Sequence, residues 1–213
     1  MVVLKDREEA GRLLAERLGA YRDDPNALIL ALPRGGVAVG YTLSLALHLP
    51  LDVLIVRKLG APGNPELAIG AVDDTTVLVI DRKLSRHVGV NDVELAEVAE
   101  HQREQLRQWL DGIGGNAVPA IADRTVLLAD DGVATGYTAQ AGVESVRRRG
   151  AARVVLAVPV APHDTAEWLE SLVDELVVLA IPEPFFAVGN FFEEWPQVTD
   201  DEVRSLLLAG NTL

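Results

Sequence analysis

The stretch VLLADDGVATGYT (residues 126–138) places two adjacent carboxylates where an apolar strand gives way to a helix. Asp130 and Asp131 end the apolar run, and Gly132 and Gly136 let the following backbone bend so that successive amides converge. Such a turn before a helix binds phosphate, while paired carboxylates accept hydrogen bonds from vicinal sugar hydroxyls or hold a divalent cation. The stretch therefore predicts a sugar-phosphate site. Simple helix capping, the plainer interpretation, requires only one acid.

Apolar strand-like runs alternate with helix-like segments on both sides of this stretch. The strand-like runs are residues 26–33, 51–58, 124–129, 153–160 and 175–181. The helix-like segments are residues 6–18, 36–49, 91–112, 136–149 and 164–173, with a last short helix from about residue 199. Three of these helices begin with a capping-box pair, namely Asp6 and Glu9, Asn91 and Glu94, and Thr199 and Glu202. The alternation predicts an α/β fold, a parallel twisted sheet flanked by helices, with sites at the carboxyl ends of the strands.

Two segments depart from this alternation within what we expect to be a single domain over residues 1–213. Residues 59–123 read as an insertion that contains a loop, a hairpin with Asp73 and Asp74 at its turn, and a long helix. Residues 181–213 are rich in aromatic residues and proline at their start, and we expect them to form a small hood-like appendage.

Bulk composition limits the classes of function. The 213 residues are 49% hydrophobic, which suffices for one buried core, and the absence of cysteine excludes disulfides and thiolate sites. The net charge of −13 disfavours nucleic acid as a partner, although a local cluster of amides and cations can still bind a small anion. No apolar run approaches the roughly 18 residues that span a bilayer, so we expect a cytoplasmic protein without a membrane partner.

A second glycine turn, LPRGG (residues 32–36), follows the first predicted strand. Gly35 and Gly36 free the backbone amides, and Arg34 supplies a planar cation suited to phosphate oxygens. The full G-x-G-x-x-G spacing of a dinucleotide-binding turn is absent, which leaves a Rossmann-type dinucleotide binder as a weaker hypothesis. Arg57 and Lys58 end the next predicted strand, either at the same edge of the sheet as this turn or as ordinary surface charge.

The two turns together resemble the type I phosphoribosyltransferases. VLLADDGVATGYT is similar to their signature for 5-phosphoribosyl-1-pyrophosphate (PRPP), departing from its commonest form at Tyr137, and LPRGG resembles their pyrophosphate loop, which commonly has a cis peptide before its basic residue. We therefore expect a cis or strained Pro33–Arg34 bond. Residues 60–70 fall where the family has a mobile catalytic loop. The landmarks RKLGAPGNPE and FFAVGNFFEEW extend the resemblance, to predicted bacterial phosphoribosyltransferases, over nearly the whole chain.

The resemblance implies a role for each residue of the two turns. The amides and hydroxyls of the loop would bind the 5-phosphate, the two aspartates would bind the ribose hydroxyls and Mg²⁺, and the basic residues would stabilise departing pyrophosphate. The implied 5-phosphate residues are Val133, Ala134, Thr135, Gly136, Tyr137 and Thr138. The implied pyrophosphate residues are Arg34, Gly35, Gly36, Arg57 and Lys58. The implied catalytic residues are Asp130, Asp131, Arg34 and Lys58, and the implied Mg²⁺ ligands are Asp130 and Asp131.

The acceptor is less clearly indicated. Ala134 stands where family members acting on 6-oxopurines carry an aspartate, and RVVLAVPVA lacks the lysine that contacts the 6-oxo group. The segment IPEPFFAVGNFFEEW nevertheless resembles the base-covering segment of those same enzymes. By that resemblance Phe186 would stack on a flat ring, Val188 would line the pocket and Glu193 would supply the acid. Alternatively, the four phenylalanines simply pack a small subdomain.

The sequence thus predicts an Mg²⁺-dependent phosphoribosyltransferase, a pentosyltransferase of the kind that serves nucleotide salvage. Its predicted substrates are PRPP and a nitrogenous, aromatic small-molecule acceptor, and pyrophosphate would be released. The alternative is a protein of the same fold that senses or binds PRPP without turnover, which Ala134 and the missing lysine motivate. The oligomeric state stays open, with a homodimer among the expected assemblies.

Overall fold

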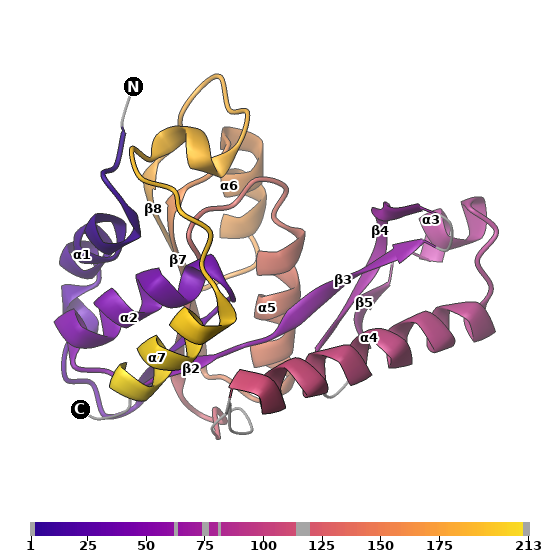
Figure 1. The fold of residues 1–213 in the computed structure, drawn as a ribbon, viewed down its shortest axis with the longest axis horizontal. Coiled ribbons are helices and arrows are strands. Elements are labelled where there is room, and N and C mark those ends of the chain that lie inside the picture. Colours follow the sequence, from indigo (N-terminus) through magenta and orange to yellow (C-terminus); the bar gives the residue numbers. More distant parts are fainter. Residues whose placement is uncertain (1–2, 62–63, 74–76, 81, 114–119, 211–213) are drawn as a thin grey trace.

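The core of the protein is a five-stranded parallel sheet, as expected. The computed structural model describes residues 3–61, 64–73, 77–80, 82–113 and 120–210 (Figure 1). The strand order is β2-β1-β6-β7-β8, with all pairs parallel. The strands are β1 (Ala27–Ala31), β2 (Leu51–Val53), β6 (Thr125–Ala129), β7 (Arg153–Val160) and β8 (Glu175–Ala180).

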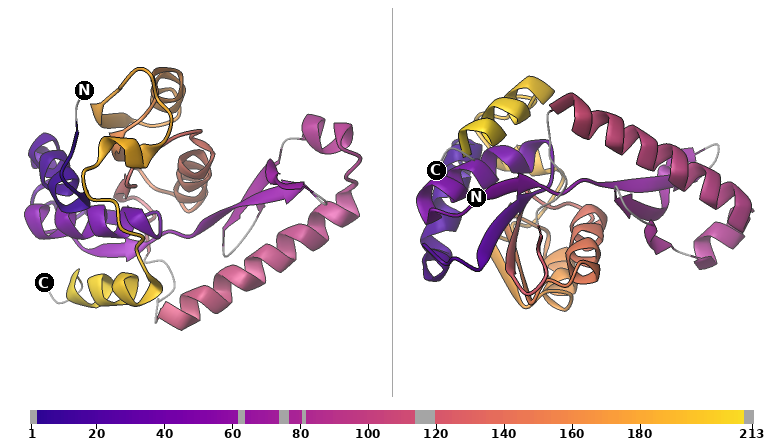
Figure 2. Two further views of the ribbon diagram at one scale, coloured as in Figure 1. Left: turned by 45° about the horizontal axis from the view of Figure 1, so that its top comes forward. Right: turned by 90° about the horizontal axis from the view of Figure 1, so that it is seen from below.

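Helices cover both faces of the sheet (Figure 2). Ile29 of β1 faces one apolar cluster, whereas the next residue, Leu30, faces the other, because successive side chains of a strand point to opposite sides. The first face packs against α1 (Arg7–Arg17), α2 (Gly35–Leu47) and α7 (Asp200–Gly210). The second packs against α5 (Tyr137–Arg148) and α6 (His163–Glu170). Short 3-10 helices lie at η1 (Gly19–Tyr21) and η2 (Val188–Phe191). Burial on both faces explains the continuous apolar runs of the strands.

The predicted helix caps are present. Asp6 accepts a hydrogen bond from the amide of Glu9 at 2.8 Å, at the start of α1. Glu94 and Asn91 bond reciprocally at the start of α4 (Asp92–Ile113). Thr199 and Glu202 do the same at α7. In the described part of the chain, no helix combines the length and apolar character needed to cross a membrane.

The predicted insertion forms an arm that projects from the sheet (Figure 1). It consists of β3 (Val56–Ala61), β4 (Asn64–Asp73), β5 (Val77–Ile80), α3 (Arg82–His87) and α4, and its three strands form an antiparallel sheet. The predicted hairpin corresponds to the β4–β5 pair. The expected strand over residues 51–58 is wrong: it breaks after Val53, because the chain leaves the parallel sheet and pairs with β4 instead.

The loop expected at residues 60–66, within the stretch 60–70 where the resemblance implies a mobile catalytic loop, is also largely strand. Gly60 and Ala61 belong to β3 and residues 64–70 to β4, whereas residues 62–63 lie outside the described part of the chain. The prolines and glycines of this segment led us to expect a loop, but backbone pairing between β3 and β4 overrides that local preference. Register shifts at Leu59/Gly60 and Gly60/Ala61 show where the glycine disturbs the ladder.

A buried carboxylate fastens the arm to the core. Asp73, at the end of β4, is 1% exposed and accepts hydrogen bonds from the hydroxyl of Ser145 at 2.7 Å and from Arg149 at 3.2 Å. Both partners belong to α5 or its C-terminal cap. Asp73 therefore anchors the arm, whereas we had expected it in a hairpin turn; Asp74, the other residue of that expected turn, lies outside the described residues.

Candidate active site

The two glycine turns meet at the carboxyl ends of neighbouring strands. β1 pairs with β6 up to Ala31 and Ala129, and the amide of Leu32 donates to the carbonyl of Ala129 at 2.8 Å. The approach is so close that a Cβ on Gly35 would overlap the carboxylate of Asp131, and one on Gly36 would lie 2.7 Å from the carbonyl oxygen of Ala129. Gly35 and Gly36 lie in the first turn of α2, and it is this close contact with the acid-bearing turn that requires them to be glycine.

The peptide between Pro33 and Arg34 is cis, as the resemblance led us to expect. Arg34 follows it immediately, with a side chain 44% exposed, and α2 begins at Gly35. The turn thus presents a cation at the start of a helix, where backbone amides also favour an anion.

The two aspartates occupy different environments. Burial raises the pKa of Asp130 well above its usual range, and the neighbouring charge of Asp131 raises it further. The Oδ1 atom of Asp130 accepts a hydrogen bond from the amide of Asp131 at 2.8 Å. The pair is therefore asymmetric, with one carboxylate desolvated and the other held by a cation.

That cation is Arg7 in the first turn of α1. Its Nε atom lies 2.7 Å from Oδ2 of Asp131, and its Nη1 atom donates to the carbonyl of Pro196 at 2.8 Å. The guanidinium also lies 3.6 Å from the ring centroid of Trp195. Sequence reasoning missed Arg7. The available signal was an arginine in the first turn of a helix, where the macrodipole disfavours a cation unless a nearby anion compensates.

The predicted phosphate loop leads into α5, and Val133 differs from its other residues. Gly136, with φ of 80°, leads into α5, and Thr135, Tyr137 and Thr138 are exposed beside it. Among the described residues, the amides of residues 134–138 have no hydrogen-bond acceptor, so they are available to an anion. Val133 is different, because its amide donates to Val160 at 2.9 Å and its side chain is buried. Val133 therefore shapes the loop but offers no amide to a phosphate.

A polar pocket of about 430 Å³ lies beside the LPRGG turn. Arg34 and Arg57 both line it, although Arg57 comes from β3 of the arm rather than from the parallel sheet. Arg57 also donates to Gln105 of α4 at 3.0 Å. Lys58 follows on β3 and pairs with Ala71, but its side chain lies outside the described part of the structure. Sequence reasoning missed two further lining residues, Trp109 and Asp200.

The predicted acceptor residues are only partly brought to this site. A Cβ on Gly132 would overlap Val188, so the hood packs directly on the turn that follows Asp130 and Asp131, here called the acid turn. Phe186 is 81% exposed and lines a separate pocket of about 580 Å³ at the end of β8. The side chain of Glu193 is exposed, while its amide donates to the carbonyl of Leu4. Of the four phenylalanines of the hood, Phe185, Phe191 and Phe192 pack in its core.

The carboxylates offer an incomplete set of ligands for a metal. Within the described residues, no three or more histidine or acidic side chains gather as metal ligands. Mg²⁺ is commonly held by one or two carboxylates together with oxygens of a phosphorylated substrate. Asp130, whose charge is otherwise desolvated, and Asp131 fit that arrangement when the substrate supplies the remaining oxygens.

The fold and the paired turns define a phosphoribosyltransferase-type protein. The model of the phosphoribosyl transferase domain family matches residues 4–187, and the chain belongs to that family. A Mycobacterium tuberculosis protein named "Putative phosphoribosyl transferase MT0597" is 40% identical over 209 residues, covering 97% of this chain and 47% of its own length. The chain thus spans about half the length of that curated relative.

Solved structures agree on the architecture. The protein TT1426 from Thermus thermophilus has a TM-score of 0.85 and 38% identity, over 98% of this chain and 99% of its own. A purine phosphoribosyltransferase from Pyrococcus horikoshii has a TM-score of 0.51 and 21% identity, over 93% of this chain and 97% of its own. The second likeness concerns the fold alone.

Proposed function

We propose that the protein transfers the 5-phosphoribosyl group of PRPP to a nitrogen of an aromatic acceptor and releases pyrophosphate. The observation that supports this most is the contact between the LPRGG turn and Asp131, which brings an anion-binding turn, a carboxylate pair and a phosphate loop to one sheet edge. PRPP carries the three matching groups: pyrophosphate, ribose hydroxyls and a 5-phosphate. We place the reaction in the cytoplasm and, by its class, in nucleotide salvage.

In this proposal, different residues bind the 5-phosphate, the ribose hydroxyls and the pyrophosphate of PRPP. The free amides of residues 134–138 and the N-terminus of α5 hold the 5-phosphate, while Asp130 and Asp131 hold the ribose hydroxyls. Arg34 and Arg57 bind the pyrophosphate. As the bond between C1 and the pyrophosphate oxygen breaks, both of its electrons leave with pyrophosphate, and the two arginines stabilise that charge. The acceptor nitrogen then bonds to C1 and loses its proton.

Mg²⁺ would be held by Asp130 and Asp131 together with oxygens of PRPP, and it would neutralise charge on the leaving group. On this chain's side, the requirement is that both carboxylates face the substrate. Arg7 fixes Asp131, and the amide of Asp131 fixes Oδ1 of Asp130. The site therefore holds both acids in place before the substrate arrives.

The acceptor is proposed to be a flat nitrogen heterocycle that needs no general base at position 134. Val188 would contact it next to the acid turn. The exposed ring of Phe186 would stack on it only after moving from its position at the end of β8, because that pocket does not include the aspartates. A methyl group at Ala134 can accept no proton, which favours acceptors that lose their proton to solvent.

Calorimetry with PRPP and Mg²⁺, followed by a pyrophosphate-release screen over nucleobases, tests the proposal. We expect micromolar to millimolar PRPP binding by the wild type and its loss in Asp130→Asn/Asp131→Asn. The Asp111→Asn variant, which changes an exposed carboxylate of α4, is the control and should bind as the wild type does. A wild type that releases no heat with PRPP would refute the proposal.

A second candidate is a PRPP-binding regulatory protein without turnover, and the exposed Ala134 favours it because that position supplies no acid or base. The same screen separates the two candidates. Binding of PRPP without pyrophosphate release for any acceptor would support the regulatory protein, whereas release with one heterocycle would support the enzyme.

A further inference from the structure

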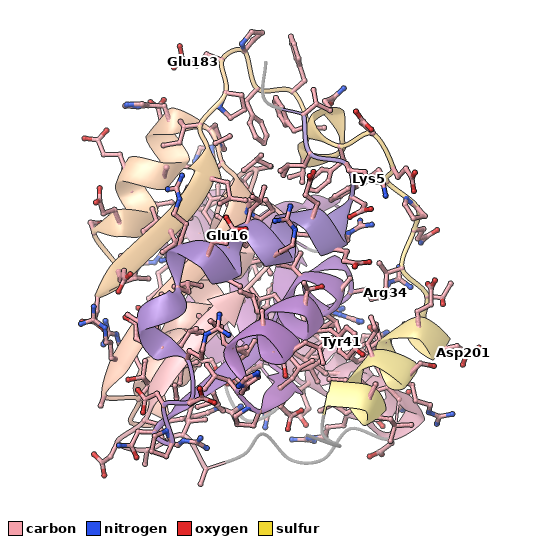
Figure 3. All side chains as sticks on the ribbon, turned by 90° about the vertical axis from the view of Figure 1, so that its left-hand side faces the viewer. Lys5, Glu16, Arg34, Tyr41, Glu183 and Asp201 are labelled. Atoms are coloured by element: carbon pink, nitrogen blue, oxygen red, sulfur yellow. The ribbon has the colours of Figure 1, made fainter. Side chains whose placement is uncertain are left out.

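Asp200 places a protein carboxylate inside the pocket that is proposed to hold pyrophosphate. It is the first residue of α7, and its Oδ1 atom accepts a hydrogen bond from the indole Nε1 of Trp109 at 2.9 Å. The same oxygen lies 3.6 Å from Nη1 of Arg34. Three segments far apart in the sequence therefore converge here: the LPRGG turn, the end of α4 and the start of α7. Figure 3 shows Arg34 beside the start of α7.

The carboxylate stands where a ligand phosphate would pair with the arginine. Among the residues that line this pocket of about 430 Å³, Arg34 and Arg57 carry positive charge and Asp200 carries the negative charge. An incoming anion must therefore compete with Asp200 for Arg34, or lie close to the carboxylate. Either arrangement costs free energy that grows with the negative charge of the ligand.

The Arg34–Asp200 pair has the properties of a contact that a ligand can displace. The side chains are 44% and 50% exposed, and exposed ion pairs contribute little to stability. Trp109, in contrast, holds Asp200 by a well-formed hydrogen bond from a different element. When Arg34 turns to a ligand, the carboxylate therefore remains near the pocket.

We infer that Asp200 is a specificity-determining residue that disfavours metal-free pyrophosphate and selects the pyrophosphate group in its magnesium complex. The inference rests on the proposed function, because it assigns the pocket to the pyrophosphate group. Bound Mg²⁺ reduces the charge of the anion, so the repulsion from Asp200 falls. The carboxylate also balances the charge of Arg34 when the pocket is empty.

Titration of inorganic pyrophosphate by calorimetry, with and without Mg²⁺, tests this on the full chain. Asp200→Asn removes the charge but keeps an oxygen that can accept the bond from Trp109. We expect it to tighten metal-free pyrophosphate binding by about three- to ten-fold, the effect of removing about one nearby like charge. With Mg²⁺ the gain should be markedly smaller. Asp200→Ala should show the same dependence on Mg²⁺.

Asp201→Asn is the matched control, because Asp201 is the next residue of the same helix turn, is exposed, and is absent from the lining of this pocket. It makes the same change in net charge and in the charge at the start of α7. Its pyrophosphate affinity should equal that of the wild type under both conditions. Equal tightening in both variants would show a general charge effect and overturn the inference.

The remaining outcomes separate the inference from the proposed function. Unchanged or weaker metal-free binding in Asp200→Asn, with PRPP binding intact in the wild type, would overturn the role of Asp200 alone. A gain that is the same with and without Mg²⁺ would also overturn it. If the wild type and all variants bind neither pyrophosphate nor PRPP, the proposed function fails and the inference fails with it.

Discussion

Arg7 and Asp131 form an ion pair at 2.7 Å between the first turn of α1 and the carboxyl end of β6. The side chains are only 10% and 16% exposed, so both charges are largely removed from water, and each compensates the desolvation of the other. Because Arg7 also contacts Trp195 and the carbonyl of Pro196, it connects the beginning of the chain, the acid pair and the hood.

Replacing Arg7 should destabilise the protein strongly. Arg7→Ala leaves Asp131 without its cation and removes the contact with Trp195, and the expected loss is about 3 kcal/mol in the free energy of unfolding. Urea unfolding monitored by circular dichroism measures it. Arg12→Ala on the same helix is the control, since Arg12 is exposed and pairs with Glu16 at the surface, and its effect should stay within about 0.5 kcal/mol. Equal unfolding midpoints for the two variants would contradict this role for Arg7.

A methyl group at Gly132 should separate the hood from the acid turn. Gly132 has φ of 146°, and the added Cβ would overlap Val188, so both backbone strain and a side-chain clash result. We expect Gly132→Ala to cost about 2–4 kcal/mol in unfolding free energy. In the control, Gly19→Ala, the new Cβ would have no atom within 4 Å, and a change below about 1 kcal/mol is expected. A fully tolerated Gly132→Ala would show that the hood is not fixed on this turn.

Replacing Asp73 should destabilise the arm more than it destabilises the parallel sheet. Asp73→Ala removes the acceptor shared by Ser145 and Arg149, and leaving buried polar partners unsatisfied costs about 1–3 kcal/mol. Hydrogen exchange followed by mass spectrometry should show faster exchange in β3 to β5 than in β1 and β6. Uniform acceleration across both sheets would instead mean that the arm and the core unfold together.

Stability should fall in acid partly through Asp174. The hydrogen bond from the amide of Val154, at 2.7 Å, lowers the pKa of Asp174, and the ion pair with Arg147 lowers it further. A carboxyl with a lowered folded-state pKa stabilises the fold above its unfolded pKa of about 3.9, and that stabilisation is lost as pH falls through the folded value. The difference in urea midpoint between wild type and Asp174→Asn should therefore be present at pH 7 and shrink toward about pH 2. A difference that is constant over this range would contradict the assignment.

Local chemistry predicted the parts of the site that lie within single turns. The glycine turn into α5 and the capping boxes depend on residues a few positions apart, and each is present. The cis peptide before Arg34 is also present, but it was expected from the family resemblance rather than from local chemistry. The parallel sheet followed from the alternation of apolar runs, because strands buried on both faces leave a strong pattern.

Contacts between distant segments could not be predicted in this way. Arg7 and Asp200 enter the site from the two terminal helices, and no local pattern specifies their partners. The amide of Val133 was predicted to bind phosphate, but the partner that occupies it, Val160, comes from the neighbouring strand. The break after Val53 likewise depends on pairing with β4, which competes with continuation in the parallel sheet.

The pairing of β1 with β6 means that the two turns of the site are synthesised at different times. Ala31 pairs with Ala129, and the whole arm lies between them in the sequence. The LPRGG turn therefore leaves the ribosome long before its partner strand exists, and closing so long a stretch of chain carries an entropic penalty. Because the strands of the arm form a sheet of their own, the chain crosses this long stretch without placing a strand between β1 and β6, and the two turns stay adjacent.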